Sequence, residues 1–313
     1  MNFQKIPPVE SGKLFLDIAF RKAREKGKSK TLKGNWLQIV RQKEALKLDI
    51  IKANLYTRLN NILATFPDTN ALPDFYIKLM RLTLEFTDFK KSLGAINWAI
   101  KKISRFQKTY VSKIIKSKDR DMVKNLSKQF YGRISSVLKQ IESNLSYLEL
   151  CRKIMRSYPD IKDMFTVCIY GFPNVGKSTL LNKMTNTKAE VAAYAFTTKS
   201  INVGYLETKD EKIQVIDVPG TLARADRRND IEMQAELVMK ELSNIVVYVF
   251  DLSIYCGYSI EKQIELYHKL GEKKKVLIYL SKTDLIDSEI VDNFDYKHYS
   301  LEEIKEKIVE LAK

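Results

Sequence analysis

Hydrophobic residues in the first 160 positions recur at the three- and four-residue spacing of helices. Ser11 can cap the first predicted helix, which is expected to end near Gly27 and whose apolar face is formed by Leu14, Phe15, Ile18 and Ala19. Further helices are predicted from about 35 to 64, from 74 to 92, after Gly94, and from 119 to 156, where Pro159 follows. Four or five helices of this length predict an antiparallel bundle.

After Met164 the apolar spacing changes to that of short buried strands. The strand segments are FTVCIY, INVGYLE, KIQVIDV, IVVYVFDL and KVLIYL, with helical segments such as Asn229 to Leu242 and Ile260 to Leu270 between some of them. This alternation predicts a doubly wound, mainly parallel sheet that binds its ligand at the carboxyl ends of the strands. We therefore expect two domains, a helical bundle over residues 1–160 and an α/β domain over residues 161–313.

Charge is distributed unevenly along the 313 residues, whose net charge is +16. Through Met164 there are 34 Lys and Arg against 15 Asp and Glu, a balance of +19, whereas the remainder has a balance of −3. A basic domain joined to a near-neutral one indicates that the first binds a polyanion, because contacts to phosphates release counterions. The alternative is that many of these lysines only solvate the outer faces of helices.

Other features of the composition exclude several classes of protein. The longest strongly apolar run, Ile245 to Phe250, is far shorter than the roughly 20 residues of a membrane-spanning helix. The first residues lack the apolar stretch of a secretory signal, so we expect a cytoplasmic protein with no membrane partner. Three widely spaced cysteines match no zinc or disulfide pattern and are expected to be buried in a reducing compartment; they are Cys151, Cys168 and Cys256.

A phosphate-binding motif follows the first strand and precedes a helix. The segment matches G-x-x-x-x-G-K-S, and its loop amides and helix N-terminus are expected to surround phosphates. Lys177 would reach the β- and γ-phosphates, and Ser178 would ligate Mg²⁺. The residues expected to bind the nucleotide here are Gly171, Phe172, Pro173, Asn174, Val175, Gly176, Lys177, Ser178 and Thr179.

Two further segments indicate a switch that responds to the γ-phosphate. Asp217 ends a buried strand and is expected to reach Mg²⁺ through water, and the amide of Gly220 is placed to sense the γ-phosphate. Thr197 and Thr198 lie between a helix and a strand, where one hydroxyl can ligate Mg²⁺; we favour Thr198. The predicted metal ligands are therefore Ser178, Thr198 and Asp217, and the predicted catalytic groups are Lys177, Thr198 and Gly220.

The last strand leads into a segment that predicts guanine selectivity. Ser281, Lys282 and Asp284 follow KVLIYL, and the carboxylate of Asp284 can accept hydrogen bonds from N1–H and the exocyclic amine of guanine. Adenine lacks the N1–H donor, so this residue would select GTP and GDP over adenine nucleotides. Ser300 precedes the last helix, and its amide is expected to bind the guanine O6.

Together these motifs resemble the translation-factor-related GTPases of the Obg/HflX-like superfamily. The segments YAFTTKS, QVIDVPG, RNDIEMQA and DLSIYCGYSIEKQ are similar to the nucleolar GTP-binding protein 1 family, and KSLGAINWAIKKIS and SYLELCRKIMRSYP extend the similarity into the bundle. The resemblance implies a helical N-terminal domain, a P-loop GTPase domain and a role in maturing the large ribosomal subunit. Eukaryotic members continue beyond the GTPase domain, whereas this sequence ends at Lys313, so we expect those extensions and their functions to be missing.

Two departures from the superfamily concern the guanine pocket. Ser281 replaces the Asn of the usual N-K-x-D motif, which predicts weaker binding of GTP. Only about 15 residues separate Asp284 from Ser300, so the helix usually found between them is expected to be short or missing.

The sequence predicts slow intrinsic hydrolysis. Thr221 and Leu222 follow Gly220, where a Ras-like enzyme carries the glutamine that orients water. Asn174 occupies the loop position at which potassium-stimulated GTPases carry Asn, so K⁺ is a candidate cofactor; the alternative is that Asn174 only satisfies hydrogen bonds of the loop.

We expect a GTP-dependent assembly factor whose basic bundle binds large-subunit rRNA or a subunit precursor, with ribosomal proteins as further candidate partners and a monomer off the ribosome. The first alternative is a structural RNA-binding placeholder whose GTPase domain is weakly active, which Ser281 and the absent glutamine favour. The second is a GTPase of tRNA modification or membrane transport, which the bundle and the lack of a membrane span disfavour.

Overall fold

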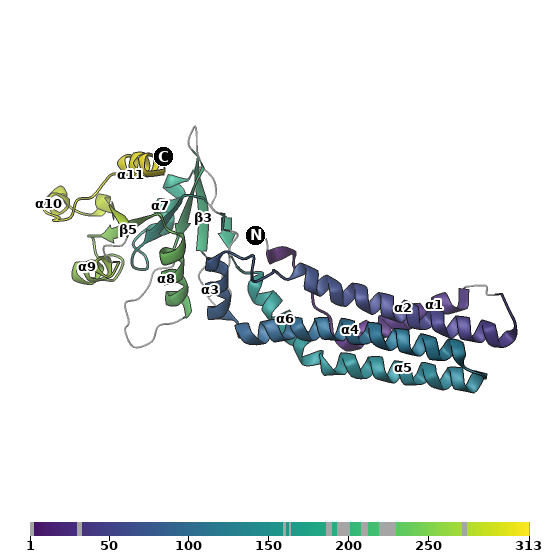
Figure 1. Cartoon of the computed structure of the whole chain (residues 1–313). Coiled ribbons are helices and arrows are strands. Elements are labelled where there is room, and N and C mark those ends of the chain that lie inside the picture. Colours follow the sequence, from purple (N-terminus) through teal and green to yellow (C-terminus); the bar gives the residue numbers. More distant parts are fainter. Residues whose placement is uncertain are drawn as a thin grey trace. The chain divides into compact units, whose positions relative to one another are not determined.

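The chain folds into two compact units. The computed structural model describes residues 3–29, 33–158, 161–162, 164–185, 190–192, 201–207, 212–218, 230–270 and 274–312 (Figure 1). The helical unit comprises Gln4–Ala71 and Leu84–Arg156, and the sheet unit comprises Met1–Phe3, Leu72–Thr83 and Ser157–Lys313. The predicted order, a helical bundle followed by an α/β domain, is confirmed.

Long helices of the predicted bundle make up the helical unit. They are α1 (Gly12–Ser29), α2 (Trp36–Thr65), α4 (Phe86–Lys116), α5 (Arg120–Gln140) and α6 (Glu142–Met155), after a 3₁₀ turn at Phe3–Lys5. Helix α2 packs on α1 and α4, and α4 packs on α5 and α6. Helices α4 and α5, joined by residues 117–119, run antiparallel side by side, and α6 continues from α5 after the single residue Ile141 (Figure 1). The core contains the heptad-like stripe of α2, which is Leu48, Ile51, Leu55, Leu59 and Ile62.

Side-chain caps explain where two of these helices begin. Asn35 Oδ1 accepts a hydrogen bond from the Gln38 amide at 2.9 Å, and Gln38 Oε1 accepts one from the Asn35 amide at 3.0 Å. This capping box satisfies two amides that a helix N-terminus leaves without intrahelical partners. Asp119 caps α5 in the same manner, with its carboxylate 2.7 Å from the Met122 amide.

The predicted helix limits differ from the structure at three places, whereas α1 ends at Ser29, near the predicted Gly27. Gly94 lies inside the 31-residue helix α4 rather than at its start, and the helix predicted over 119–156 is two helices, α5 and α6, which meet at Ile141. The helix predicted over 74–92 is two helices, α3 (Asp74–Thr83) and α4, although no Gly or Pro separates them. The break reflects tertiary structure, because α3 belongs to the sheet unit and α4 to the helical unit.

Helix α3 is anchored within the sheet unit by polar and aromatic contacts. It packs on α8 (Asp230–Leu242), where Lys78 forms an ion pair with Glu241 at 2.7 Å. The Tyr76 hydroxyl accepts a hydrogen bond from the Ile161 amide at 2.9 Å. Phe3 packs edge-on against the Tyr76 ring, with ring centroids 5.0 Å apart. Residues 72–83 thus join the fold of a sheet that begins more than 80 positions later.

The sheet has six strands in the order β2-β3-β4-β1-β5-β6. Their bounds are β1 Thr166–Tyr170, β2 Glu190–Ala192, β3 Ile201–Glu207, β4 Lys212–Asp217, β5 Ile245–Asp251 and β6 Lys275–Ser281. Strands β4, β1, β5 and β6 are parallel, whereas β2 and β3 are antiparallel to their neighbours. The mainly parallel sheet is therefore confirmed, and β2 is a strand that the sequence pattern did not predict.

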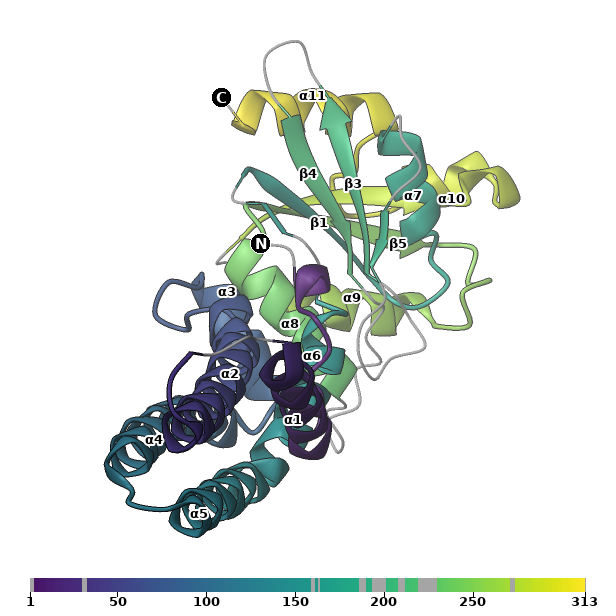
Figure 2. The ribbon, with the colours of Figure 1, turned by 90° about the vertical axis from the view of Figure 1, so that its right-hand side faces the viewer.

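Helices cover both faces of this sheet, which makes it doubly wound (Figure 2). Helices α7 (Lys177–Met184) and α11 (Leu301–Ala312) lie on one face, and α8 and α9 (Ile260–His268) lie on the other. A 3₁₀ turn at Thr283–Leu285 and the short α10 (Ser288–Asp292) complete the unit. Strand β5 is buried along its whole length, as expected of a parallel strand covered on both faces.

Two expectations from the composition can be compared with the described residues. Among them, no helix is long and apolar enough to cross a bilayer. Cys151, Cys168 and Cys256 are free and buried, as predicted.

Replacing Gly94 by alanine is expected to stabilise the helical unit. A Cβ at this position would meet no atom within 4 Å, and glycine inside a helix costs about 1 kcal/mol relative to alanine. We expect Gly94→Ala to raise the free energy of unfolding by about 0.5–1 kcal/mol in urea titrations followed by circular dichroism. The matched control is Gly12→Ala, whose Cβ would lie 2.6 Å from Glu142 Oε2. That variant should lose stability, and equal behaviour of the two would contradict this account.

Candidate functional site

The loop between β1 and α7 has the backbone that close approach to a ligand requires. Gly171 has φ 148° and Gly176 has φ 96°, both in the region that favours glycine. A Cβ on Gly171 would lie 2.8 Å from the Val249 carbonyl oxygen, so no other residue fits there. Gly176 directly precedes α7, whose first amides have no intrahelical acceptor and face an incoming anion. The loop therefore has the backbone geometry that a phosphate-binding cradle requires.

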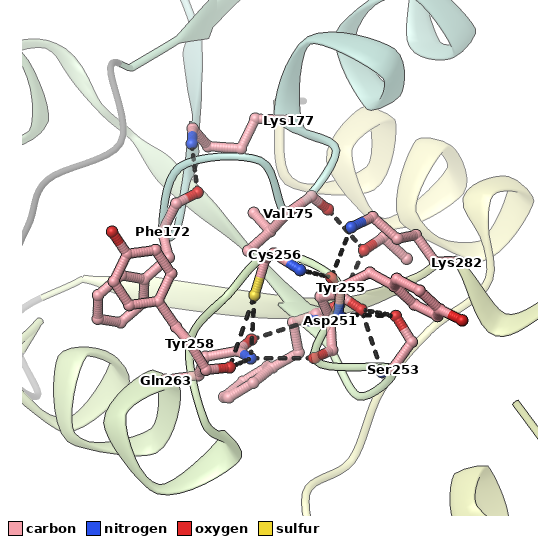
Figure 3. Close-up of polar contacts among 12 residues, drawn as sticks. Phe172, Val175, Lys177, Asp251, Ser253, Tyr255, Cys256, Tyr258, Gln263 and Lys282 are labelled. Atoms are coloured by element: carbon pink, nitrogen blue, oxygen red, sulfur yellow. Dashed lines mark hydrogen bonds and ion pairs between the residues drawn. The ribbon is translucent and has the colours of Figure 1, made fainter. Parts of the chain in front are cut away.

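Lys177 lies over this cradle. Its Nζ donates hydrogen bonds to the carbonyl oxygens of Phe172 at 2.7 Å and Gly171 at 3.1 Å, and the side chain is buried (Figure 3). Phe172 in turn stacks on Tyr258, with ring centroids 4.4 Å apart. These contacts hold the lysine head within the loop, and its binding of phosphate oxygens stays a prediction.

The rest of the loop presents exposed positions to a ligand. Asn174 and Thr179 are exposed, Pro173 is half-buried, and Val175 is fully buried. Asn174 has φ 62°, a left-handed conformation that Asn tolerates better than most residues. In the described part of the chain the Asn174 side chain makes no hydrogen bond. Hydrogen bonding within the loop therefore does not account for an Asn at this position.

Two of the three predicted magnesium ligands lie together. The Ser178 hydroxyl donates a hydrogen bond to the Asp217 carboxylate, which also accepts one from Asn202 Nδ2 at 3.3 Å. Burial raises the pKa of Asp217, and the hydrogen bond from Ser178 and the nearby Lys177 oppose this only in part. A divalent cation bound beside Asp217 would stabilise the charged carboxylate and so offset the rest of the effect of burial. Within the described residues no three His, Cys, Asp or Glu side chains form a metal cluster. One hydroxyl and one carboxylate suit Mg²⁺, which takes its other ligands from phosphates and water.

The guanine loop is bonded to the phosphate loop. Ser281 Oγ donates to the Val175 carbonyl oxygen at 2.6 Å and lies 3.0 Å from the Phe250 carbonyl oxygen. The serine that replaces the usual Asn thus keeps a direct link between the two loops. The residues present fit a guanine nucleotide in this respect, since both loops are fixed to one another at the carboxyl edge of the sheet.

Asp251 is a site residue that motif analysis missed. It ends β5 directly opposite Ser281 of β6, and its side chain is fully buried. Lys282 Nζ forms an ion pair with Asp251 Oδ2 at 2.6 Å, which positions the lysine next to Ser281 in the guanine loop (Figure 3). Lys282 itself has φ 54°, so its backbone depends on tertiary contacts to hold this turn.

A local network holds the Asp251 carboxylate in place. It accepts hydrogen bonds from the Cys256 amide at 2.9 Å and from the amide and hydroxyl of Ser253. Gln263 of α9 bonds both backbone groups of Asp251 at 2.9 Å. Burial alone would raise the pKa of Asp251, but the hydrogen bonds from Lys282 and Ser253 outweigh it and hold this pKa below its usual value. The sequence feature that could have identified Asp251 is an acid at the end of a buried strand, close to the turn SIYCGY.

Asp284 lies in the 3₁₀ turn that follows β6, and Ser300 directly precedes α11. Asp284 is exposed in the 3₁₀ turn that follows Lys282. Tyr299 pairs in parallel with Tyr279 of β6, which brings Ser300 toward the same edge. The Ser300 amide donates to Glu303 Oε2 at 2.8 Å in a capping box of α11, a bond that guanine O6 would have to replace. Helix α10 has five residues, so the expectation of a short helix between the two motifs is confirmed.

Several predicted groups lie outside the described residues. These are Thr197, Thr198 and Gly220, together with Thr221 and Leu222, which follow Gly220 where a Ras-like enzyme carries the glutamine. Their roles stay predictions.

The Asp251 pair provides a test by pH. Because the folded-state pKa of Asp251 is lowered, its contribution to stability is present above the unfolded pKa near 4 and is lost as pH falls through the folded value. Asp251→Asn should lower the free energy of unfolding at pH 7 by about 2 kcal/mol. The gap from wild type should shrink in urea titrations as pH falls below the unfolded pKa of about 4. Asp292→Asn, at an exposed acid, is the control and should leave stability unchanged. A gap independent of pH would contradict the assigned ion pair.

Comparison with known families matches both units of the chain. A model of the NOG1 N-terminal helical domain matches residues 3–162, and a model described as 50S ribosome-binding GTPase matches residues 166–282. The chain is 38% identical over 259 residues to an uncharacterized protein of Methanocaldococcus jannaschii, covering 82% of this chain and 73% of that protein.

Named relatives are longer than this chain. Nucleolar GTP-binding protein 1 of Drosophila melanogaster is 35% identical over 293 residues, which is 92% of this chain and 45% of the relative, so the chain spans about half the length of that protein. A solved structure titled as a putative nucleolar GTP-binding protein 1 from Plasmodium falciparum is 26% identical, with a TM-score of 0.39 over 50% of this chain and 90% of that one. With its N-terminal helical domain and its GTPase domain both matched, the chain belongs to the nucleolar GTP-binding protein 1 family.

Proposed function

We propose that the chain binds and slowly hydrolyses GTP as an assembly factor of the large ribosomal subunit, with its basic helical unit bound to rRNA. In this proposal the nucleotide state of the GTPase domain determines when the factor leaves the subunit. Membership of the family and the match to a 50S ribosome-binding GTPase domain support it. A cytoplasmic location and a monomeric state off the ribosome remain predictions.

One observation carries the nucleotide part of the proposal: the Ser281 hydroxyl bonds the phosphate loop at Val175. A nucleotide bridges the phosphate loop and the guanine loop, so a fixed distance between them is a precondition of tight binding. Asp284 would accept from guanine, and Lys177 would bind the β- and γ-phosphates. Mg²⁺, when bound by Ser178 and Asp217, supplies positive charge next to the phosphates.

The proposed slow rate follows from the lack of a residue that orients water. Thr221 directly follows Gly220 and lacks the amide side chain of the glutamine that orients water, and neither histidine lies in a nucleotide motif. Lys177 and the loop amides would still stabilise charge on the phosphates, so hydrolysis is slowed and not abolished. Faster turnover would then require an additional cation or a partner.

Asn174 is the residue we propose to hold that cation. Its side chain is exposed on the phosphate loop and makes no hydrogen bond within the described residues. An amide oxygen at this position suits a monovalent ion such as K⁺, which would add positive charge beside the phosphates. Asn174 has a left-handed backbone, which Asn tolerates better than most residues, and this is a second explanation for Asn at this position. The test must therefore separate the effect of the amide side chain from the effect of the backbone conformation.

Replacing Lys177 by alanine tests the switch. We expect nucleotide affinity to fall about 100-fold, since a charge-assisted contact to phosphate contributes about 3 kcal/mol. Co-sedimentation with purified large subunits should depend on the nucleotide (GTP analogue, GDP or none) for the wild type and be constant for Lys177→Ala. Lys183→Ala, at an exposed lysine of the same helix, is the control. If Lys177→Ala is released from subunits as the wild type is, the protein acts as the structural placeholder.

Comparing KCl with NaCl at equal ionic strength tests Asn174. Turnover of GTP should be faster in KCl, on the order of 10²-fold, which is the usual effect of one fixed group that stabilises charge. Asn174→Gly keeps the left-handed backbone accessible and removes the amide, so it should turn over equally slowly in both salts. Equal rates for the wild type, or a potassium effect that persists in Asn174→Gly, would exclude this role.

A further inference from the structure

A groove on the helical unit lies outside everything assigned so far. Helices α4 and α5 lie side by side (Figure 1). The groove is formed by side chains of these two helices and has a volume of about 570 Å³. Most of its lining comes from one stripe of α4, which includes Trp98, Lys102, Arg105, Phe106 and Lys113. These positions recur at the spacing of a helix face and span about 22 Å along the axis. Arg133 adds a cation from α5.

The groove concentrates positive charge that is not neutralised. No acidic residue lines it, and in the described part of the chain its four cations form no ion pair. Elsewhere in the same unit basic side chains do find partners, for example Arg58 with Glu10 at 3.0 Å and Arg152 with Glu149 at 2.7 Å. A row of unpaired cations in a concave surface attracts a polyanion such as a phosphate backbone.

Aromatic faces in the groove add a second kind of recognition. Trp98 is 40% exposed, whereas large aromatic residues of the core such as Phe89 and Phe130 are fully buried. Lys102 Nζ lies 5.6 Å from the centroid of the Phe106 ring, so the cations and the aromatic rings are interleaved. An exposed indole beside phosphate-binding cations is the arrangement on which an unpaired base can stack.

Cations beside an exposed indole favour single-stranded over double-stranded nucleic acid. A duplex keeps its bases stacked inside and offers only its backbone, so it could use the cations but not Trp98. An unpaired strand offers both a base and its phosphates, and stacking tolerates any sequence because every base has a flat face.

We propose that this groove binds an unpaired RNA segment, with a base stacked on Trp98 and phosphates held by Lys102, Arg105 and Arg133. The inference rests on the proposed function, because it names the RNA form that the helical unit recognises. It goes beyond that function in assigning the contact to one groove and one indole.

The test uses the full chain and two labelled RNA probes, a single-stranded 12-mer of uridine and a hairpin duplex of equal charge. Trp98→Ala should weaken binding of the single strand about 5- to 150-fold, the usual range for a lost base stack, and should leave duplex binding and salt dependence unchanged. Trp98→Phe should restore most of the affinity. Because Trp98 is partly exposed, these variants should fold, which circular dichroism checks.

Charge variants test the phosphate contacts. The double variant Lys102→Gln and Arg105→Gln should reduce the slope of log affinity against log salt by about 1.4, since each single-strand phosphate contact contributes about 0.7. The matched control is Lys101→Gln with Lys108→Gln, which removes the same charge from exposed positions of α4 outside the groove. Equal slopes in the two double variants would overturn the proposal.

Two further measurements separate failure of the groove from failure of the proposed function. If the wild type sediments with large subunits and Trp98→Ala does so equally well and binds both RNA probes like the wild type, the groove assignment is overturned and the proposed function stands. If the wild type binds neither RNA probe nor subunits, the proposed function itself fails. A polyglutamate peptide serves as the competing ligand, and the test is whether it binds the wild type and Trp98→Ala with equal affinity and displaces the RNA. That result would identify an acidic protein as the occupant and overturn the proposal.

Discussion

The hydrogen bond from Ser281 Oγ to the Val175 carbonyl oxygen is the interaction on which the nucleotide site depends. Strands β1, β5 and β6 are parallel neighbours, so their carboxyl ends meet at one edge of the sheet and their loops arrive together. Register alone places those loops near one another but does not fix their separation. The buried serine hydroxyl does so with one short bond, and the Asp251 and Lys282 pair holds the same guanine loop from its other side.

This arrangement explains how a departure from the usual guanine motif is accommodated. Asn has a longer side chain than Ser, so a serine can reach the phosphate loop only if the backbones are close. A Cβ on Gly176 would lie 3.5 Å from the Ser281 Cβ, an ordinary van der Waals contact that confirms how near the two loops are. The sequence predicted weaker binding from the loss of Asn; the structure shows that the bond between loops survives, while the affinity itself stays a prediction.

The parts of the fold that could be predicted are those whose local signal agrees with their tertiary setting. The phosphate loop was predictable because the glycines, the buried strand and the following helix are contiguous in sequence, and strands β1 and β5 were predictable because they are apolar on both faces. The break between α3 and α4 was not, since no residue near Leu84 disfavours a helix and only packing on α8 separates the two. Asp251 was missed for the same reason: its role comes from Lys282, which lies 31 positions later.

The two units treat charge in opposite ways, which has a consequence for how the protein responds to its surroundings. In the sheet unit the functional charges are held by partners, Asp251 by Lys282 and Lys177 by loop carbonyls, and such enclosed contacts are little affected by salt. In the helical unit the cations of the groove, such as Arg105 and Arg133, are exposed and form no ion pair among the described residues. Binding of a polyanion through these cations would weaken as the salt concentration rises, because counterion release into a more concentrated solution is less favourable. Ionic strength should therefore act on attachment to a polyanion and leave nucleotide binding nearly constant. In the proposed function, the bound nucleotide would determine whether the protein stays on the subunit. The charge of its helices would set the affinity for RNA in both the GTP and the GDP state.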